Sequence, residues 1–150
     1  LSANQQWLER FNNIFKSKPQ WQELTRFENC KNEFDAGRYQ SLVVLLDGFL
    51  KDYKGSIWGF DRDALLLSGQ CYVQLGKTEE AYDALLQLIF EYPDSLQADE
   101  ASIILGYTYM INNQFDLARN IFKVLINSSI RSQYLDKANR YLERINLLTQ

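Results

Sequence analysis

Few residues in this chain are of types that carry out chemistry. The sequence holds two cysteines, Cys30 and Cys71, and no histidine. Zinc sites use histidine or closely spaced cysteines, and neither pattern is present. The sequence therefore predicts no metal and no cofactor. The simplest interpretation of both cysteines is that of small, buried apolar side chains, with a disulfide as the alternative.

The carboxylates form no pattern typical of an active site. A carboxylate pair could act in general acid–base catalysis, but the acids here stand at expected helix caps and on outward faces. The sequence also lacks a nucleophile motif and a glycine-rich phosphate loop. We therefore expect a protein that is not an enzyme. We interpret the acidic run through Asp94, Asp99 and Glu100 as a solvated face, or else as a contact for a basic partner.

Composition and charge restrict the remaining classes. Of the 150 residues, 46% are hydrophobic and two are proline, which favours an ordered, all-helical protein. Residues 61–130 carry ten acids against four bases, so the clustered basic face of a nucleic-acid-binding protein is missing. No apolar segment reaches the roughly 20 residues needed to span a bilayer. Because the chain opens at Leu1 without a methionine, we expect a processed or trimmed piece.

An internal repeat is the strongest signal in the sequence. Residues 63–93 and 100–130 align with an offset of 37 residues. A period in this range is typical of arrays in which helix pairs bury their apolar faces on their neighbours, and such arrays mostly hold other proteins. The aligned pairs are Gly69 with Gly106, Tyr72 with Tyr109, Ala81 with Ala118 and Leu85 with Phe122.

Periodicity and turn residues predict where the helices of these two units begin and end. The expected helices cover residues 63–75, 78–91, about 96 to a turn at 112–113, and 115–126. Thr78 is expected to cap the second of these helices, with Glu79 and Glu80 in its first turn. The segment 92–95 should end that helix, and Asp94 or Ser95 should cap the next.

Two glycines fall inside predicted helices, where each costs about 0.8–1 kcal/mol relative to alanine. Because this loss of helix stability occurs at the same position of both repeats, we expect a stabilising contact at that position in each. We expect the contact at Gly69 and Gly106 to be a close approach of the two helices of each pair, with Ala81 and Ala118 as the matching small surface. A larger residue at any of these positions should overpack the pair by about 1–3 kcal/mol.

The residues at these fixed offsets resemble the tetratricopeptide repeat, a helix-turn-helix unit. The unit ending in Tyr-Pro-Asp-Ser, followed by an alanine-rich start, resembles the bacterial envelope subset of the family, with its outer-membrane assembly lipoprotein and Tol-associated domains. The family positions are held by Ser68, Gly69, Tyr72, Gly76, Ala81, Leu85, Leu88 and Pro93 in one unit, and by Leu105, Gly106, Tyr109, Asn113, Ala118, Phe122, Leu125 and Ile130 in the next.

The resemblance implies an all-α fold of about three helix pairs in a right-handed superhelix, with an extra helix at each end. We expect a single domain over residues 1–150, divided into an N-terminal helix (1–19), a degenerate repeat (20–54), two further repeats (60–94 and 97–130) and a capping helix (131–150).

The flanking segments match the pattern of repeat positions less closely. In the degenerate repeat, helices are expected at about 20–34 and 38–53, with Cys30 in place of the helix glycine and a turn at Gly37 and Tyr39. Residues 3–17 read as a lone second helix, so that the array continues upstream or this helix serves as a lid. The residues of this segment that match the repeat positions are Trp7, Phe11, Ile14 and Pro19.

At the other end, one apolar stripe predicts an amphipathic capping helix with a polar outer side. Trp58, in the loop between two repeats, is expected to fill the core between them. The stripe consists of Tyr134, Leu135, Ala138, Tyr141, Leu142, Ile145 and Leu148, and the polar side of Arg131, Lys137, Arg140, Glu143 and Arg144.

In the family, the first helices line the concave face, so the resemblance implies which residues meet a partner. Tyr107 and Met110 could equally contact another part of the same array. The lysine, asparagine and arginine set of the peptide-clamping members is missing, so we do not expect a clamp for a C-terminal carboxylate. The implied residues are Phe27, Lys31, Phe34, Leu66, Gln70, Val73, Gln74, Ile103, Tyr107, Met110 and Ile111.

We therefore expect an adaptor or scaffold that binds a protein or peptide segment. We expect no binding of nucleic acid and no direct transmembrane span. A homo-oligomer and a larger multi-protein complex are both compatible with the sequence. The alternative is a structural spacer or self-association segment of a longer array. The resemblance to the bacterial envelope subset implies a periplasmic or membrane-attached bacterial protein in envelope assembly, with a cytoplasmic location as the alternative.

Overall fold

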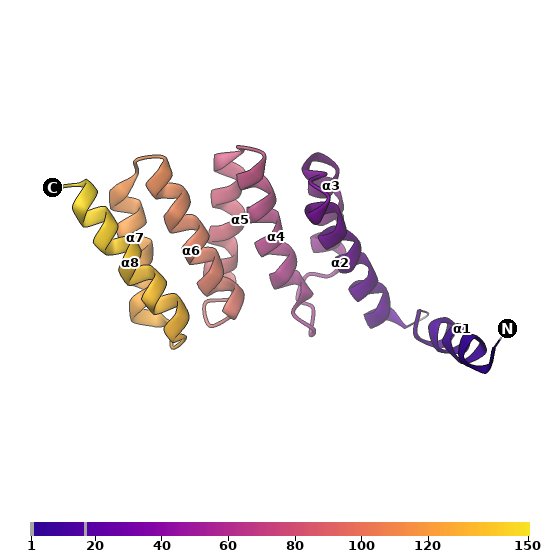
Figure 1. Cartoon of the computed structure of the whole chain (residues 1–150). Coiled ribbons are helices and arrows are strands. Elements are labelled where there is room, and N and C mark those ends of the chain that lie inside the picture. Colours follow the sequence, from indigo (N-terminus) through magenta and orange to yellow (C-terminus); the bar gives the residue numbers. More distant parts are fainter. Residues whose placement is uncertain (1, 17) are drawn as a thin grey trace. The chain divides into compact units, whose positions relative to one another are not determined.

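The computed structural model describes residues 2–16 and 18–150, and all regular structure in them is helical. This confirms the all-α prediction, and the helix bounds agree with the predicted ones to within three residues. Leu1 and Ser17, assigned above to the N-terminal segment, lie outside the described residues. The helices of the described part (Figure 1) are α1 (Ala3–Lys16), α2 (Pro19–Asp35), α3 (Tyr39–Asp52), α4 (Phe60–Gln74), α5 (Thr78–Glu91), α6 (Leu96–Ile111), α7 (Phe115–Ser128) and α8 (Ser132–Leu148).

The chain divides into two compact units, Leu1–Asp61 and Arg62–Gln150, which are described separately. The first holds α1 to α3 and the start of α4, and the second holds the rest of α4 and α5 to α8. The single domain expected from the sequence stays a prediction.

Aromatic contacts form the core of the first unit. Phe27 on α2 lies 5.9 Å from Phe49 on α3 and 5.5 Å from Phe60, measured between ring centroids. Phe49 is fully buried, as are the other predicted packing residues of α3, Leu42 and Leu46. The pairing of α2 with α3 thus follows the apolar stripe of α3, because that stripe has to leave water.

In the second unit, the two helix glycines allow the close approach that the sequence predicts. A Cβ on Gly69 would lie 2.5 Å from Cδ2 of Leu85, and one on Gly106 would lie 2.5 Å from Cε1 of Phe122. Ala81 and Ala118, which the sequence predicts to face the glycines, are buried. The side chains nearest to Gly69 and Gly106 are instead those of Leu85 and Phe122. The glycine instead receives a large side chain of the second helix, which explains why leucine and phenylalanine occupy that register.

The turns within the helix pairs share one backbone feature. Gly37, Gly76 and Asn113 each adopt positive φ, at 72°, 68° and 59°, and residues without a constraining side chain, or asparagine, tolerate this conformation best. These are the predicted turn positions. One cap differs from its prediction: Thr78 is the first helical residue of α5, and Lys77 stands at its N-cap without a side-chain hydrogen bond.

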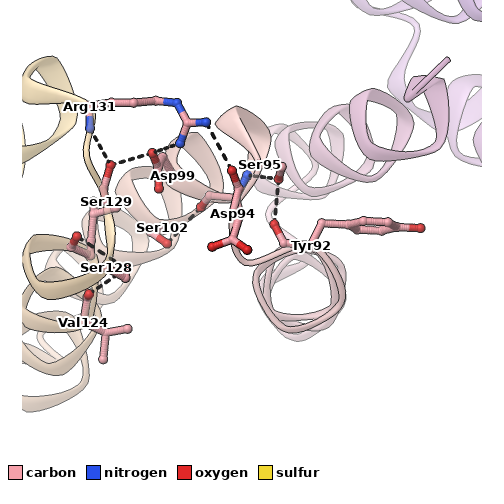
Figure 2. Close-up of polar contacts among 11 residues, drawn as sticks. Tyr92, Asp94, Ser95, Asp99, Ser102, Val124, Ser128, Ser129 and Arg131 are labelled. Carbon is pink, nitrogen blue, oxygen red and sulfur yellow. Dashed lines mark hydrogen bonds and ion pairs between the residues drawn. The ribbon is translucent and has the colours of Figure 1, made fainter. Parts of the chain in front are cut away.

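The start of α6 is fixed by a part-buried ion pair, shown in Figure 2. Asp99 is only 3% exposed, so the prediction that it belongs to a solvated acidic face is wrong. Its Oδ2 accepts hydrogen bonds from Arg131 at 2.7 Å and from Ser129 at 2.6 Å. Arg131 also donates to the carbonyl of Asp94, and Ser95 caps α6 by accepting from the backbone N–H of Ala98, as expected.

Arg131 therefore does not belong to the polar side of the last helix, as the sequence suggested. It precedes α8 and joins the loop after α7 to the start of α6. The ion pair compensates the cost of burying a carboxylate, which would otherwise be several kcal/mol.

Two further expectations concern single residues. Trp58 is 56% exposed, so it does not fill a core; Phe60, two residues later, packs on Phe27 instead. Cys30 and Cys71 are both buried and neither belongs to a disulfide, which confirms the interpretation as small core residues. Burial raises the pKa of both thiols, so little reactive thiolate forms near neutral pH.

Candidate functional site

The exposed side of the first helices in the second unit is the candidate site. We call it the A-helix face and define it by residues of α4, α6 and α8. It comprises Gln70, Val73, Gln74, Tyr107, Ile111, Lys137, Arg140, Tyr141, Arg144 and Leu148. Gly69 and Gly106 bring α5 and α7 close against α4 and α6 on the side next to this face, which leaves Gln74 and Ile111 exposed.

The structure places the predicted contact residues of the first unit in different surroundings. Phe27 is a core residue, and Phe34 is half-buried against the ring of Tyr39, 5.4 Å away. Lys31 is exposed, and its Nζ lies 3.5 Å from a carboxylate oxygen of Glu28. Of the three, Lys31 is thus the exposed one, with about half of its side chain in contact with solvent.

In the second unit the predicted set separates into exposed and buried residues. Tyr107 is 47% and Ile111 57% exposed, whereas Met110 is 8% and Ile103 7% exposed. Leu66 is also buried. The remaining predicted residues are half-buried in the case of Gln70 and Val73, and exposed in the case of Gln74.

Burial of Ile103 and Met110 has a physical cause. Helix α6 contacts α5, α7 and α8, so three of its sides face other helices. A partner can therefore reach only the strip that carries Tyr107 and Ile111, which are four residues apart and lie on one side of the helix.

Tyr107 lies at the junction of α6 and α8. Its ring centroid is 5.8 Å from that of Tyr141, and Tyr141 in turn stacks on the buried Phe122 at 5.2 Å. One edge of Tyr107 therefore packs within the array, and nearly half of the side chain faces solvent; its contact with a partner stays a prediction. This contact holds the tyrosine in place without covering it.

A framework of polar contacts positions the helices beneath this face. Gln97 on α6 donates to Asp63 on α4 at 2.7 Å. Tyr82 on α5 donates to Gln114 at 2.8 Å and accepts from Asn112 at 3.1 Å, which ties α5 to the turn after α6. These side chains bridge neighbouring helices and hold them together within this unit.

The ring of Tyr109 adds to this framework. It lies 4.5 Å from the ring of Tyr82, and burial, followed by the charges of Tyr82 and Glu79, raises the pKa of its hydroxyl. The phenol therefore stays neutral at physiological pH and contributes as a packing group.

The part of the face on α8 was missed at the sequence level. Lys137, Arg140 and Arg144 were assigned to an outer polar side, and Leu148 to the buried stripe, yet Leu148 is 59% exposed. A signal was available: Ser132, which begins α8, is 37 residues after Ser95, so α8 continues the register of the first helices. In that register Arg144 corresponds to Tyr107 and Leu148 to Ile111.

The first unit has a hollow of its own. It measures about 400 Å³ and is lined by residues of α2 and by Tyr53 at the end of α3. Arg26 borders it with its guanidinium 5.2 Å from the Tyr53 ring centroid, and the same group pairs with Asp52 at 2.6 Å. Because Arg26 is already engaged, the hollow offers mainly aromatic surface from Trp21 and Tyr53.

Within the described residues, histidine, cysteine and acidic side chains nowhere gather in groups of three or more that could hold a metal ion. A membrane-crossing helix is likewise not found among the helices that the structure describes, as none combines the necessary length and apolarity.

Comparison with known proteins supports the repeat assignment. Residues 63–95 match the tetratricopeptide repeat family model. This tetratricopeptide repeat corresponds to α4, α5 and the loop that follows. The match thus confirms, for this part of the chain, the resemblance inferred from the glycine, tyrosine and alanine spacing.

One solved structure with a similar fold is that of MamA AMB-1, at 22% sequence identity and a TM-score of 0.55. The match covers 83% of this chain and 64% of the MamA chain, so less than two thirds of MamA is represented. At this identity the likeness shows the fold alone. No curated protein matches the chain.

Proposed function

We propose that this chain is a protein-interaction module whose A-helix face holds a segment of a partner protein. The observation that carries the proposal is the exposure of Tyr107 and Ile111 on a face that is otherwise fixed by packing. Aromatic side chains held in place on one edge are effective contact residues, because binding costs them little conformational entropy. The role is non-catalytic, and the tetratricopeptide repeat match supports it.

A binding experiment with matched variants tests this proposal. The double variant Tyr107→Ala, Ile111→Ala removes the exposed contact residues, and Leu117→Ala, Val124→Ala removes two exposed apolar side chains of α7. The purified chain and both variants are used for affinity capture from lysate, read by mass spectrometry. The proposal requires partners that the first variant loses and the control retains.

The stability of each variant distinguishes this function from that of a spacer. Tyr107→Ala and Ile111→Ala should each lower the free energy of unfolding by about 0.5–1.5 kcal/mol, because both side chains are half exposed and Tyr107 loses its ring contact with Tyr141. Met110→Ala should cost more, about 2–5 kcal/mol, as a core truncation. If the Tyr107 and Ile111 variant captures the same proteins as the original chain, the face is not a binding site. The chain is then a spacer or a self-association segment.

The cellular setting is a separate proposal. The Tyr92-Pro93-Asp94-Ser95 ending and the alanine-rich start that follows support a role in bacterial envelope assembly, in the periplasm or attached to a membrane. Immunoblotting of periplasmic, membrane and cytoplasmic fractions of the source cells tests it. Recovery of the protein only in the cytoplasmic fraction would contradict it.

A further inference from the structure

Three cations on α8 stand out in the second unit because they lie on one helix and none has a charged partner. Lys77 and Lys123, which also form no ion pair with a described residue, stand apart at the N-cap of α5 and on α7. Lys137, Arg140 and Arg144 are all exposed, and none forms an ion pair with another described residue. Arg140 Nε donates to the backbone carbonyl of Asp136 on the same helix, at 3.3 Å. By contrast, Arg119 and Arg131 of the same unit are paired with aspartates.

The three cations share one stripe of the helix. They are spaced i, i+3 and i+7, which places them on one side. Lys137 and Arg144 are four residues before and three residues after Tyr141, so they flank the residue that contacts Tyr107. The acids of α8, Asp136 and Glu143, lie four residues before and three residues after Arg140 and so border the stripe on the side away from Tyr141.

Apolar side chains continue this stripe. Leu148 follows Arg144 by four residues and is 59% exposed, and Ile111 is its counterpart on α6. Tyr107, Ile111 and Leu148 therefore form an exposed apolar strip bordered by unpaired positive charge. An apolar strip with a charged border is complementary to an amphipathic segment that carries the opposite charge.

We infer that the partner segment held by the A-helix face is acidic, with carboxylates that meet Lys137, Arg140 and Arg144 and apolar side chains that meet Tyr107, Ile111 and Leu148. This inference rests on the proposed function. The net charge of −3 of the whole chain favours a local match to a peptide over binding of a polyanion, since nucleic acid or an anionic membrane would meet the repulsion of the whole molecule.

A selection from a displayed library of random 12-residue peptides tests the inference on the full chain. Peptides are selected on the original chain, and those that no longer bind the Tyr107→Ala, Ile111→Ala variant are kept. The kept peptides should be enriched in aspartate and glutamate alongside apolar residues. Their affinity should fall with rising salt, because the charges concerned are exposed.

A charge-reversal variant with a matched control makes the test specific. Arg140→Glu with Arg144→Glu should weaken the acidic peptides by about tenfold or more. The same change in charge at Lys77 and Lys123, which are exposed at the N-cap of α5 and on α7, should leave binding within about twofold. Circular dichroism confirms that both variants are folded.

The outcomes separate the two proposals. Face-dependent peptides that are neutral or basic, or that bind the charge-reversed variant equally well, would overturn the acidic partner but keep the binding face. If no selected peptide depends on Tyr107 and Ile111, the binding face itself is refuted. Vesicles containing phosphatidylserine that bind through Arg140 and Arg144, or a dimer of the free chain that these residues hold together, would assign the stripe to another occupant and also overturn the inference.

Discussion

Gly106→Ala should lower the free energy of unfolding by about 2 kcal/mol, although alanine is the better helix former. The added methyl group would lie 2.5 Å from Cε1 of Phe122, and that ring is fully buried and stacked on Tyr141. Overpacking costs about 1–3 kcal/mol, and a ring that cannot move away favours the upper end. Against this, helix propensity returns about 1 kcal/mol.

Gly48→Ala is the matched control. Gly48 lies within α3, and a Cβ there would be 3.7 Å from Nη2 of Arg26, an ordinary contact with the end of a flexible side chain. Without a clash, only the helix propensity and the reduced entropy of the unfolded chain remain. Gly48→Ala should therefore raise stability by about 0.5–1 kcal/mol. The same chemical change thus has opposite signs at the two sites.

Urea unfolding followed by far-UV circular dichroism measures both effects. In a second step, Gly106→Ala is combined with Phe122→Val, which removes the ring atoms that collide with the methyl. The penalty of Gly106→Ala should then vanish and leave the helix-propensity gain of about 1 kcal/mol, giving a coupling energy of about 3 kcal/mol between the two positions. A Gly106→Ala chain as stable as the original, or a penalty that persists beside Phe122→Val, would refute the reasoning.

Substitution, chemical modification and a change of pH should affect buried side chains differently from exposed ones. Asp99→Ala removes a buried carboxylate and leaves the half-buried Arg131 and Ser129 without their acceptor, so it should cost about 2 kcal/mol in urea unfolding. Asp116→Ala, which removes an ion pair whose carboxylate is 95% exposed, should have little effect. Cys30 and Cys71, whose thiol pKa values are raised by burial, should react with a thiol reagent at pH 8 only after urea is added; fast reaction of the folded chain would contradict this. Because the pKa of Tyr109 is raised in the folded state by burial, its contribution to stability is full below about pH 10 and is lost as the pH rises through the raised value. Unfolding midpoints measured from about pH 9 to 12 should show this loss, and a Tyr109→Phe chain should show less of it.

Most of the helical architecture was predictable because its signals are local. The turn residues Gly37, Gly76 and Asn113 require a left-handed backbone conformation, which depends on the residue itself. The apolar spacing of a helix is also a local property. The glycine register is equally visible along the chain, and it predicts correctly which helices approach one another.

The composition of the candidate site was only partly predictable. The family resemblance identified the side of α6 that carries Tyr107 and Ile111, but it also included Ile103 and Met110, which are buried. Helix α6 is apolar on most of its circumference, so its periodicity does not indicate which residues face another helix. That is decided by the helices packed around it, α5, α7 and α8.

The sequence by itself determined the helix pairs, their turns and the positions where only glycine fits, because these follow from backbone conformation and apolar spacing along the chain. The tertiary structure decided the charges: Asp99 became buried because Arg131, 32 residues later, reaches it across a loop, and the cations of α8 stayed exposed because the helix packs on its other side. Charge pairing depends on distances in space between residues far apart in the sequence, and no local pattern encodes those distances.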